Sequence, residues 1–153
     1  MLLYRFTRPP AMELFLVHPG GPFWEHKDLG VWSIPKGEFR SEEDPLEAAR
    51  REFEEETGYR ADGNFVPLKP VVLKSGKKIF AWALEFDLDP AGIRSNTFEM
   101  EFPPHSGVKR TFPEVDRGAW FKVGEAINKV NPGQIPLIRE LERKHDGNDL
   151  PVS

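Results

Sequence analysis

The sequence predicts a single domain that mixes helices and strands, of the α/β or α+β class. Its 153 residues can bury one full hydrophobic core but are too few for two. Segments that alternate with the period of a strand lie on both sides of a segment with the period and capping signals of a helix. The composition, with 39% hydrophobic and 30% charged residues, is that of a folded globular protein. We assign residues 1–145 to the domain and expect 146–153 to form a flexible tail.

The strands are predicted from residue preference and alternation. In chain order they are 2–6, 12–18, 31–34, 65–74, 77–88 and 119–122. The fourth and fifth should form a hairpin around Ser75-Gly76. In the fifth, Trp82 belongs to one of two apolar alternating sets, so we expect it in the core rather than as a platform for a ligand. Residues 89–108 show no clear period and are predicted to be irregular.

A helix over residues 45–57 carries the strongest local signals. Asp44 can cap its N-terminus, Pro45 fits the first helical position, and Glu47 occupies the capping-box position. Gly58 can end the helix because glycine adopts the left-handed conformation without steric cost. Two further helices are predicted over 123–130 and 135–144.

The central helix has an acidic shoulder beside its apolar stripe. The stripe is formed by Leu46, Ala49 and Phe53. Glu52 and Glu56 lie one turn apart next to it, and Glu55 lies further round. Half-buried carboxylates at this spacing repel one another, and a hard divalent cation would remove that repulsion. The alternative is a solvated acidic face paired with neighbouring arginines.

The order of residues around this helix favours the metal site. It reads Gly37-x5-Glu43-x7-Arg51-Glu52-Phe53-x-Glu55-Glu56-x-Gly58-Tyr59, where x is any residue. This resembles the signature of the Nudix (MutT-like) hydrolases, G-x5-E-x7-R-E-U-x-E-E-x-G-U, in which U is a bulky apolar residue. All the fixed positions match. Phe53 and Tyr59 place aromatic residues where the family more often has aliphatic ones.

The resemblance implies the Nudix fold, a mixed β-sheet sandwiched between helices. It also implies hydrolysis of a nucleoside diphosphate linked to a further group, with Mg²⁺ or Mn²⁺ as cofactor. The matching positions make Glu52 and Glu56 the main metal ligands, and Glu55 a ligand or an activator of the attacking water. The carbonyl of Gly37 would complete the metal site, while Arg51 and Glu43 would support it. Which carboxylate is the catalytic base stays open.

Other candidate site residues lie outside the motif. Glu114 precedes Trp120 by six residues, similar to the E-x5-W arrangement of many Nudix chains, and could supply a metal contact or the catalytic base. Glu99 and Glu101 are weaker candidates for that role. Substrate contacts are expected from Lys36, Trp24, Phe23 and Arg110. For each of the four, the alternative is a loop residue that anchors the loop or is solvated.

Charge and composition limit the partners. The net charge of −4 and the absence of a basic run argue against a nucleic-acid duplex as partner. A small phosphorylated substrate is compatible, because a bound metal supplies positive charge locally. No apolar run approaches the length of about 20 residues that a membrane helix needs, so we expect no membrane contact. The chain has no cysteine, which excludes thiol catalysis and thiolate metal sites. Cytoplasmic location is the default, and the oligomeric state is open.

The function predicted is a metal-dependent pyrophosphohydrolase. Its substrate would be a nucleoside polyphosphate, either an NTP or a dinucleoside polyphosphate, cleaved by attack of water at phosphorus. A different nucleoside-diphosphate-linked substrate or a diphosphoinositol is the alternative; the lead-in Trp32-x-x-Pro35-Lys36-Gly37 is common among members that act on dinucleoside polyphosphates or diphosphoinositols. A non-catalytic nucleotide-binding domain and an unrelated acidic interaction module are further alternatives.

Overall fold

A mixed sheet is the centre of the fold. The computed structural model describes residues 1–7, 11–36 and 42–151. The sheet has the strand order β3-β4-β1-β2-β7. Its strands are β1 (Leu2–Thr7), β2 (Ala11–Pro19), β3 (Val66–Val72), β4 (Lys78–Glu85) and β7 (Val115–Lys122). β1 runs parallel to β4, and the other neighbouring strands pair antiparallel.

The pairing of β2 with β7 brings the backbones close together. Phe15 lies opposite Trp120 and Val17 opposite Gly118, and the register shifts between His18 and Pro19. A Cβ atom at Gly118 would come within 2.5 Å of the Phe15 ring, so only glycine fits there without a shift. β7 begins at Val115, four residues before the predicted start at residue 119, because its pairing with β2 continues to Pro19.

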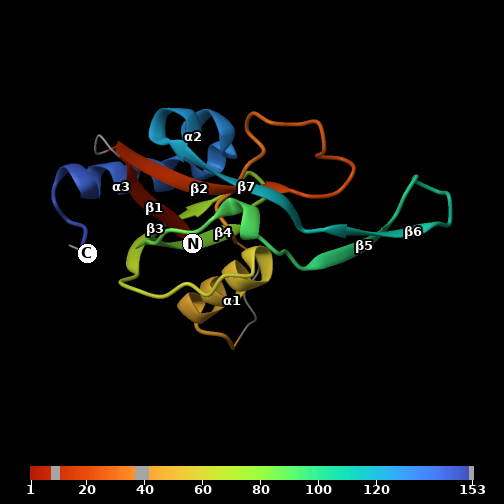
Figure 1. The fold of residues 1–153 in the computed structure, drawn as a ribbon, viewed down its shortest axis with the longest axis horizontal. Helices are drawn as coiled ribbons and strands as arrows, with labels where there is room; N and C mark the ends of the chain where they lie inside the picture. Colours follow the sequence, from red (N-terminus) through yellow and green to blue (C-terminus); the bar gives the residue numbers. More distant parts are fainter. Residues whose placement is uncertain (8–10, 37–41, 152–153) are drawn as a thin grey trace.

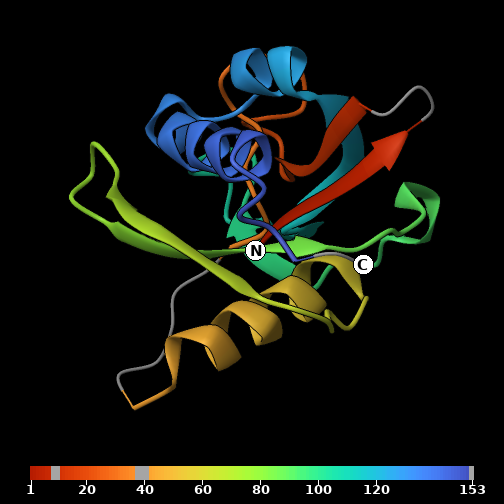
Figure 2. The same ribbon diagram turned by 90° about the vertical axis from the view of Figure 1, so that its left-hand side faces the viewer.

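Helices cover both faces of the sheet. α1 (Pro45–Thr57) packs on one face, and α2 (Val123–Lys129) and α3 (Ile135–Asp146) pack on the other (Figures 1 and 2). This arrangement confirms the predicted mixed sheet sandwiched between helices. No helix among the described residues is both long and apolar enough to cross a bilayer.

Each layer has its own core. On the α1 side, Phe53 is fully buried against Leu3, Phe15 and Leu84. The other core joins the inner face of α3 to the opposite face of the same strands; its members include Leu14, Leu16, Leu137, Ile138 and Leu141. Trp82 packs half-buried on the α1 side, so it belongs to the core, as its alternation predicts.

Residues 31–34 form two single bridges rather than the predicted strand. Ser33 pairs with Val17 on one side, and Trp32 pairs with Val130 on the other. The N–H of Ile34 then donates to the side chain of Gln134 at 3.0 Å, and Pro35 has no N–H to donate. The ladder therefore cannot continue, although the residues favour extended backbone.

The prediction that residues 89–108 are irregular is wrong in part. Thr97–Glu101 forms β5, which pairs with β6 (Lys109–Pro113) in a separate hairpin that projects from the body of the molecule (Figure 1). The alternation of Thr97 to Glu101 covers only five residues, and its partner strand lies beyond Pro103 and Pro104. A strand this short is recognised only once its partner is known.

The C-terminal segment continues from α3. This helix ends at Asp146, two residues later than predicted. Beyond it, Leu150 is partly buried and packs against the core on the α3 side. The predicted tail, residues 146–153, is thus in contact with the domain at Leu150.

Replacing Phe53 should strongly destabilise the fold. Phe53→Ala removes a fully buried ring that also meets Phe86 edge-on, with centroids 6.3 Å apart. We expect the free energy of unfolding to fall by about 3–5 kcal/mol, measured by urea denaturation. Glu54→Ala, at an exposed position of the same helix, is the control and should change it by less than about 0.5 kcal/mol. A loss below about 1 kcal/mol for Phe53→Ala would contradict the described packing.

Candidate active site

The ends of α1 are fixed by the residues that predicted them. The Asp44 carboxylate accepts a hydrogen bond from the N–H of Glu47 at 3.2 Å. Gly58 has a φ of 80° and donates its N–H to the carbonyl of Glu54 at 2.8 Å. Because both ends are set, the acidic residues between them have a defined rotation about the helix axis. Gly37, whose carbonyl was a predicted metal ligand, lies outside the described residues.

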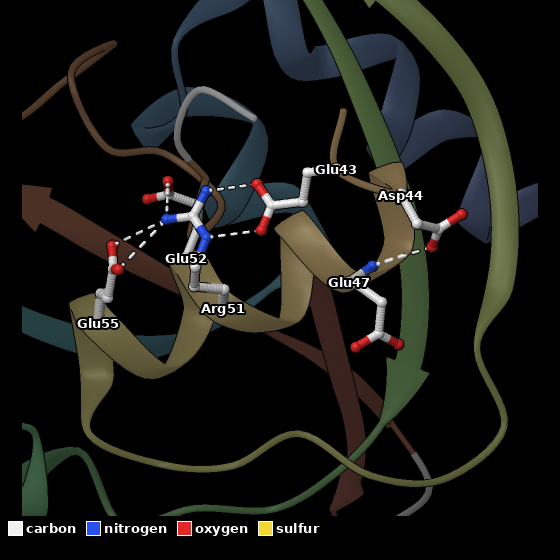
Figure 3. A network of polar contacts seen from close by, with 6 residues as sticks. All are labelled: Glu43, Asp44, Glu47, Arg51, Glu52 and Glu55. Atoms are coloured by element: carbon white, nitrogen blue, oxygen red, sulfur yellow. Dashed lines mark hydrogen bonds and ion pairs between the residues drawn. The ribbon is translucent and has the colours of Figure 1, made fainter. Parts of the chain in front are cut away.

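Arg51 lies at the centre of the acidic residues of the motif (Figure 3). Its guanidinium donates two parallel hydrogen bonds to Glu43, at 2.8 and 2.9 Å. Nη1 of the same group contacts Glu52 at 2.8 Å and both carboxylate oxygens of Glu55 at 3.2 and 3.3 Å. These bonds, those to Glu43 above all, raise the pKa of Arg51. Arg51 therefore holds the carboxylates close together despite their mutual repulsion.

Glu56 lies deeper than the other acidic residues of the helix. Its Oε2 accepts a hydrogen bond from the N–H of Lys36 at 3.1 Å. Burial raises the pKa of Glu56 to about 8, although the Lys36 N–H favours the charged form. The Met1 amino group donates to the Pro35 carbonyl at 2.8 Å. Burial lowers the pKa of this amino group to about 5. The same desolvation thus favours the neutral form of both groups.

Glu52 is half-buried, and burial also raises its pKa. Glu52 and Glu56 face a common cavity of about 600 Å³. Its wall also contains Lys36 from the segment before the motif, Trp24 from the loop after β2, and Glu114 between β6 and β7. Three predicted site residues outside the helix therefore lie with the two glutamates around one cavity.

The remaining candidates lie elsewhere. Glu55 contacts Arg51 and is not among the described residues of the cavity wall. Phe23 is 55% exposed and packs edge-on against Phe102 of the hairpin, so the structure favours the alternative that it anchors the loop. Arg110 is exposed on β6, away from this wall. Glu99 and Glu101 are exposed on β5.

The cavity also contains residues that sequence reasoning missed. Gln134 is fully buried, and its Oε1 accepts from Ile34 N–H. Asn96 lies at the base of the hairpin, where its carbonyl accepts from Glu114 N–H at 2.9 Å. Lys77 and Asn131 also contribute to the wall. Residues 131–134 lie between the two predicted C-terminal helices, and nothing in their local pattern indicates that they line a cavity together with the motif helix.

The residues of this cavity fit a divalent cation by their chemistry. Mg²⁺ prefers carboxylate oxygens, and Glu52 and Glu56 place two carboxylates on one wall, in surroundings that disfavour their negative charge. In the part of the chain that the structure describes, no group of three or more histidine, aspartate or glutamate residues is arranged to hold a metal ion. Glu52 and Glu55 are bound to Arg51 instead.

Comparison with known proteins supports the resemblance stated above. A family model described as NUDIX domain matches residues 6–141. An octanoyltransferase of Myxococcus xanthus is 34% identical over 101 residues, which are 66% of this chain and 25% of that protein. The chain thus spans about a quarter of the length of the curated relative it matches.

Solved structures share the fold. An Ap4A hydrolase of C. elegans, in a binary complex, has a TM-score of 0.65 at 19% identity and covers 95% of this chain and 96% of its own. The NUDIX domain of Shewanella oneidensis NrtR, complexed with ADP ribose, has a TM-score of 0.65 at 13% identity, with coverages of 94% and 84%. The Nudix hydrolase RenU of M. smegmatis has a TM-score of 0.54 at 20% identity, with coverages of 99% and 85%. At these identities the likeness extends to the fold alone.

The burial of Glu56 predicts a pH-dependent difference in stability. Between pH 4.5 and about 8 the unfolded chain loses the Glu56 proton while the folded chain keeps it, so the folded state loses stability as pH rises. Glu56→Gln lacks this titration. In chelator, we expect the variant to gain stability relative to wild type across this window, by a few kcal/mol at about 1.4 kcal/mol per pKa unit.

Urea denaturation at a series of pH values measures this difference. The Met1 amino group titrates in both proteins, and because the Glu56 charge raises the pKa of Met1, the difference between the two proteins reports on this coupled pair. Glu47→Gln, at an exposed position of the same helix, is the control and should follow wild type at every pH. A difference for Glu56→Gln that does not vary with pH would contradict the burial of its charge.

Proposed function

We propose that this chain, which belongs to the Nudix family, is a hydrolase of phosphoanhydride bonds and that its substrate is a nucleoside polyphosphate. An NTP or a dinucleoside polyphosphate fits best, cleaved by attack of water at phosphorus. The family membership and the fold shared with an Ap4A hydrolase and with an ADP-ribose-bound Nudix domain support this choice. Another nucleoside-diphosphate-linked compound or a diphosphoinositol is the alternative substrate.

One observation carries the proposal. Glu52 and Glu56 of the motif helix share a cavity wall with Lys36, Trp24 and Glu114, which come from other segments of the chain. A polyphosphate needs positive charge, a nucleoside needs a flat apolar surface, and attack at phosphorus needs an oriented water molecule. This cavity combines groups suited to each of these needs.

We propose Mg²⁺ or Mn²⁺ as cofactor, held by Glu52 and Glu56 with Glu55 and the Gly37 carbonyl as further ligands. A divalent cation there would neutralise phosphate oxygens and lower the pKa of a bound water. Glu55 contacts Arg51 and is not among the described residues of the cavity wall, so its side chain would have to move to reach the metal. Arg51 and Glu43 would keep the helix carboxylates in place.

The chain's own residues would complete the reaction. Lys36 and Lys77 can attract the substrate phosphates electrostatically. The exposed ring of Trp24 can stack on a base. Glu114 is exposed at the cavity, where its carboxylate could act as the base that accepts a proton from the attacking water.

A substrate panel with Mg²⁺ and with Mn²⁺ tests the proposed function. It should contain NTPs, dinucleoside tetraphosphates, ADP-ribose, sugar nucleotides and diphosphoinositols, with product analysis to identify the broken bond. We expect turnover of an NTP or a dinucleoside polyphosphate that stops in chelator. Preferred turnover of a diphosphoinositol would establish the alternative substrate, and tight nucleotide binding without turnover would contradict catalysis.

Glu56→Gln should abolish most of the activity. The substitution keeps the size of the side chain but removes a carboxylate that we propose as a metal ligand. We expect kcat to fall at least about 10³-fold on the best substrate, with the fold retained in circular dichroism. Glu47→Gln is the matched control and should keep wild-type kcat. Full Mg²⁺-dependent activity in Glu56→Gln would refute the assignment.

Glu114→Gln tests the proposed base. We expect kcat to fall about 10²- to 10³-fold with little change in KM, because a base acts in the transition state rather than in substrate binding. Glu99→Gln, on the exposed hairpin, serves as control and as the rival candidate. A large fall in kcat for Glu99→Gln with none for Glu114→Gln would assign the catalytic base to Glu99 instead.

A further inference from the structure

His18 is a buried histidine with two specific partners outside the cavity wall. It lies near the end of β2 and is fully buried. Its Nδ1 is 2.9 Å from the carboxylate of Asp116, and its Nε2 is 2.6 Å from the carbonyl of Lys27. The edge of the ring also meets Trp32, with centroids 5.1 Å apart.

Both partners of His18 are hydrogen-bond acceptors. A carbonyl has no proton to donate, and the Asp116 carboxylate, which also lies 3.5 Å from Arg117, accepts from a ring N–H. Only an imidazolium, with a proton on each ring nitrogen, donates both bonds at once. His18 therefore forms a clamp between a loop carbonyl and a strand carboxylate.

The loop held by this clamp contributes to the cavity. We call residues 20–30 the Trp24 loop; it lies beside β7 and α2 (Figure 1). Its start donates from Gly20 N–H to the Glu114 carbonyl at 2.9 Å, and its end donates from Gly30 N–H to the Asn128 carbonyl at 3.1 Å. Between these ends, Lys27 donates its N–H to the carbonyl of Trp24 at 2.9 Å. His18 thus holds the middle of the loop next to Trp24.

The strand end of the clamp lies near a second residue of the cavity. Asp116 follows Glu114 by two residues, at the point where the β2–β7 register shifts. The other charged groups nearby are Arg117 on β7 and Asp28 of the loop, which accepts from Trp32 and pairs with Lys129 of α2. None of them replaces His18 as a donor to both Lys27 and Asp116.

We propose that His18 is a positioning residue for the hydrolysis. It holds the position of Trp24 through the carbonyl of Lys27, and the position of Glu114 through the carboxylate of Asp116. One buried ring thus fixes two parts of the cavity wall relative to each other. This inference rests on the proposed function, because it gives Trp24 a role in substrate binding and Glu114 a role in the chemical step.

Two substitutions of His18 test its hydrogen bonds to Lys27 and Asp116 one at a time. The amide nitrogen of asparagine takes the place of Nδ1, so His18→Asn keeps the donor to Asp116 and loses the bond to Lys27. The amide nitrogen of glutamine takes the place of Nε2, so His18→Gln keeps the donor to Lys27 and loses the bond to Asp116. We expect KM to rise about tenfold in His18→Asn with kcat within about threefold. In His18→Gln we expect kcat to fall about tenfold with KM near wild type.

A double-mutant cycle tests the path through the loop. If His18 acts on binding through Trp24, His18→Asn should raise KM in wild type but not in a Trp24→Ala background. His26→Asn makes the same change at an exposed position of the same loop and should leave both constants unchanged. Equal effects of His18→Asn and His18→Gln on KM and kcat would overturn the proposal, because a purely structural histidine would not separate them.

Hydrogen exchange and NMR test the clamp independently of turnover. Amide protection of residues 20–30 should fall in His18→Asn and be retained in His18→Gln. In the wild-type chain, both ring nitrogens of His18 should carry slowly exchanging protons that bond to Lys27 and Asp116; an unprotonated Nε2 would overturn the proposal even if neither variant folds. If wild type hydrolyses no compound of the panel, the proposed function fails, while these two measurements still decide whether the clamp exists.

Discussion

The bonds between Arg51 and three glutamates are the interaction on which the site depends. Carboxylates at neighbouring turns of one helix repel one another, and burial beside an apolar stripe increases that repulsion. The planar guanidinium offsets it by donating to Glu43, Glu52 and Glu55 together (Figure 3). Since Glu43 precedes the helix, the same group also binds a residue outside the helix to it. A lysine could not do this, because its ammonium lacks the two parallel donors that bind Glu43.

For Glu56, the effect of burial on the carboxylate is not offset by any described arginine contact. No arginine contact is described for its carboxylate, which accepts a backbone N–H from Lys36 while burial holds its pKa near 8. A protein selected for stability alone would have an apolar residue there, since a buried carboxylate opposes folding whenever it is charged. The proposed role of Glu56 as an anionic ligand for a cation would explain why a glutamate occupies this position. Stability and the proposed chemistry therefore place opposite demands on one side chain.

The rest of the cavity is built from segments that are distant in sequence. Trp24 comes from the loop after β2, Asn96 and Glu114 from the two ends of the β5–β6 hairpin, and Gln134 from the turn before α3. Each segment is held by backbone bonds, such as the Asn96–Glu114 pair, or by a buried polar side chain such as His18. The walls of the cavity therefore depend on the packing of the whole sheet, whereas the motif helix contributes one wall only.

The sequence by itself determined the features that arise within a few residues. The capped helix from Pro45 to Thr57, the alternation of β4 and the spacing of the acidic motif follow from local periods and caps, and the structure bears out the first two. Glu114 was predicted from its distance to Trp120, and it does lie at the cavity. Tertiary structure alone decided the rest: that Thr97–Glu101 is a strand, that residues 31–34 are not, and that Gln134 is buried at the cavity wall rather than exposed to solvent. These outcomes depend on partners far along the chain, whose positions no local pattern specifies.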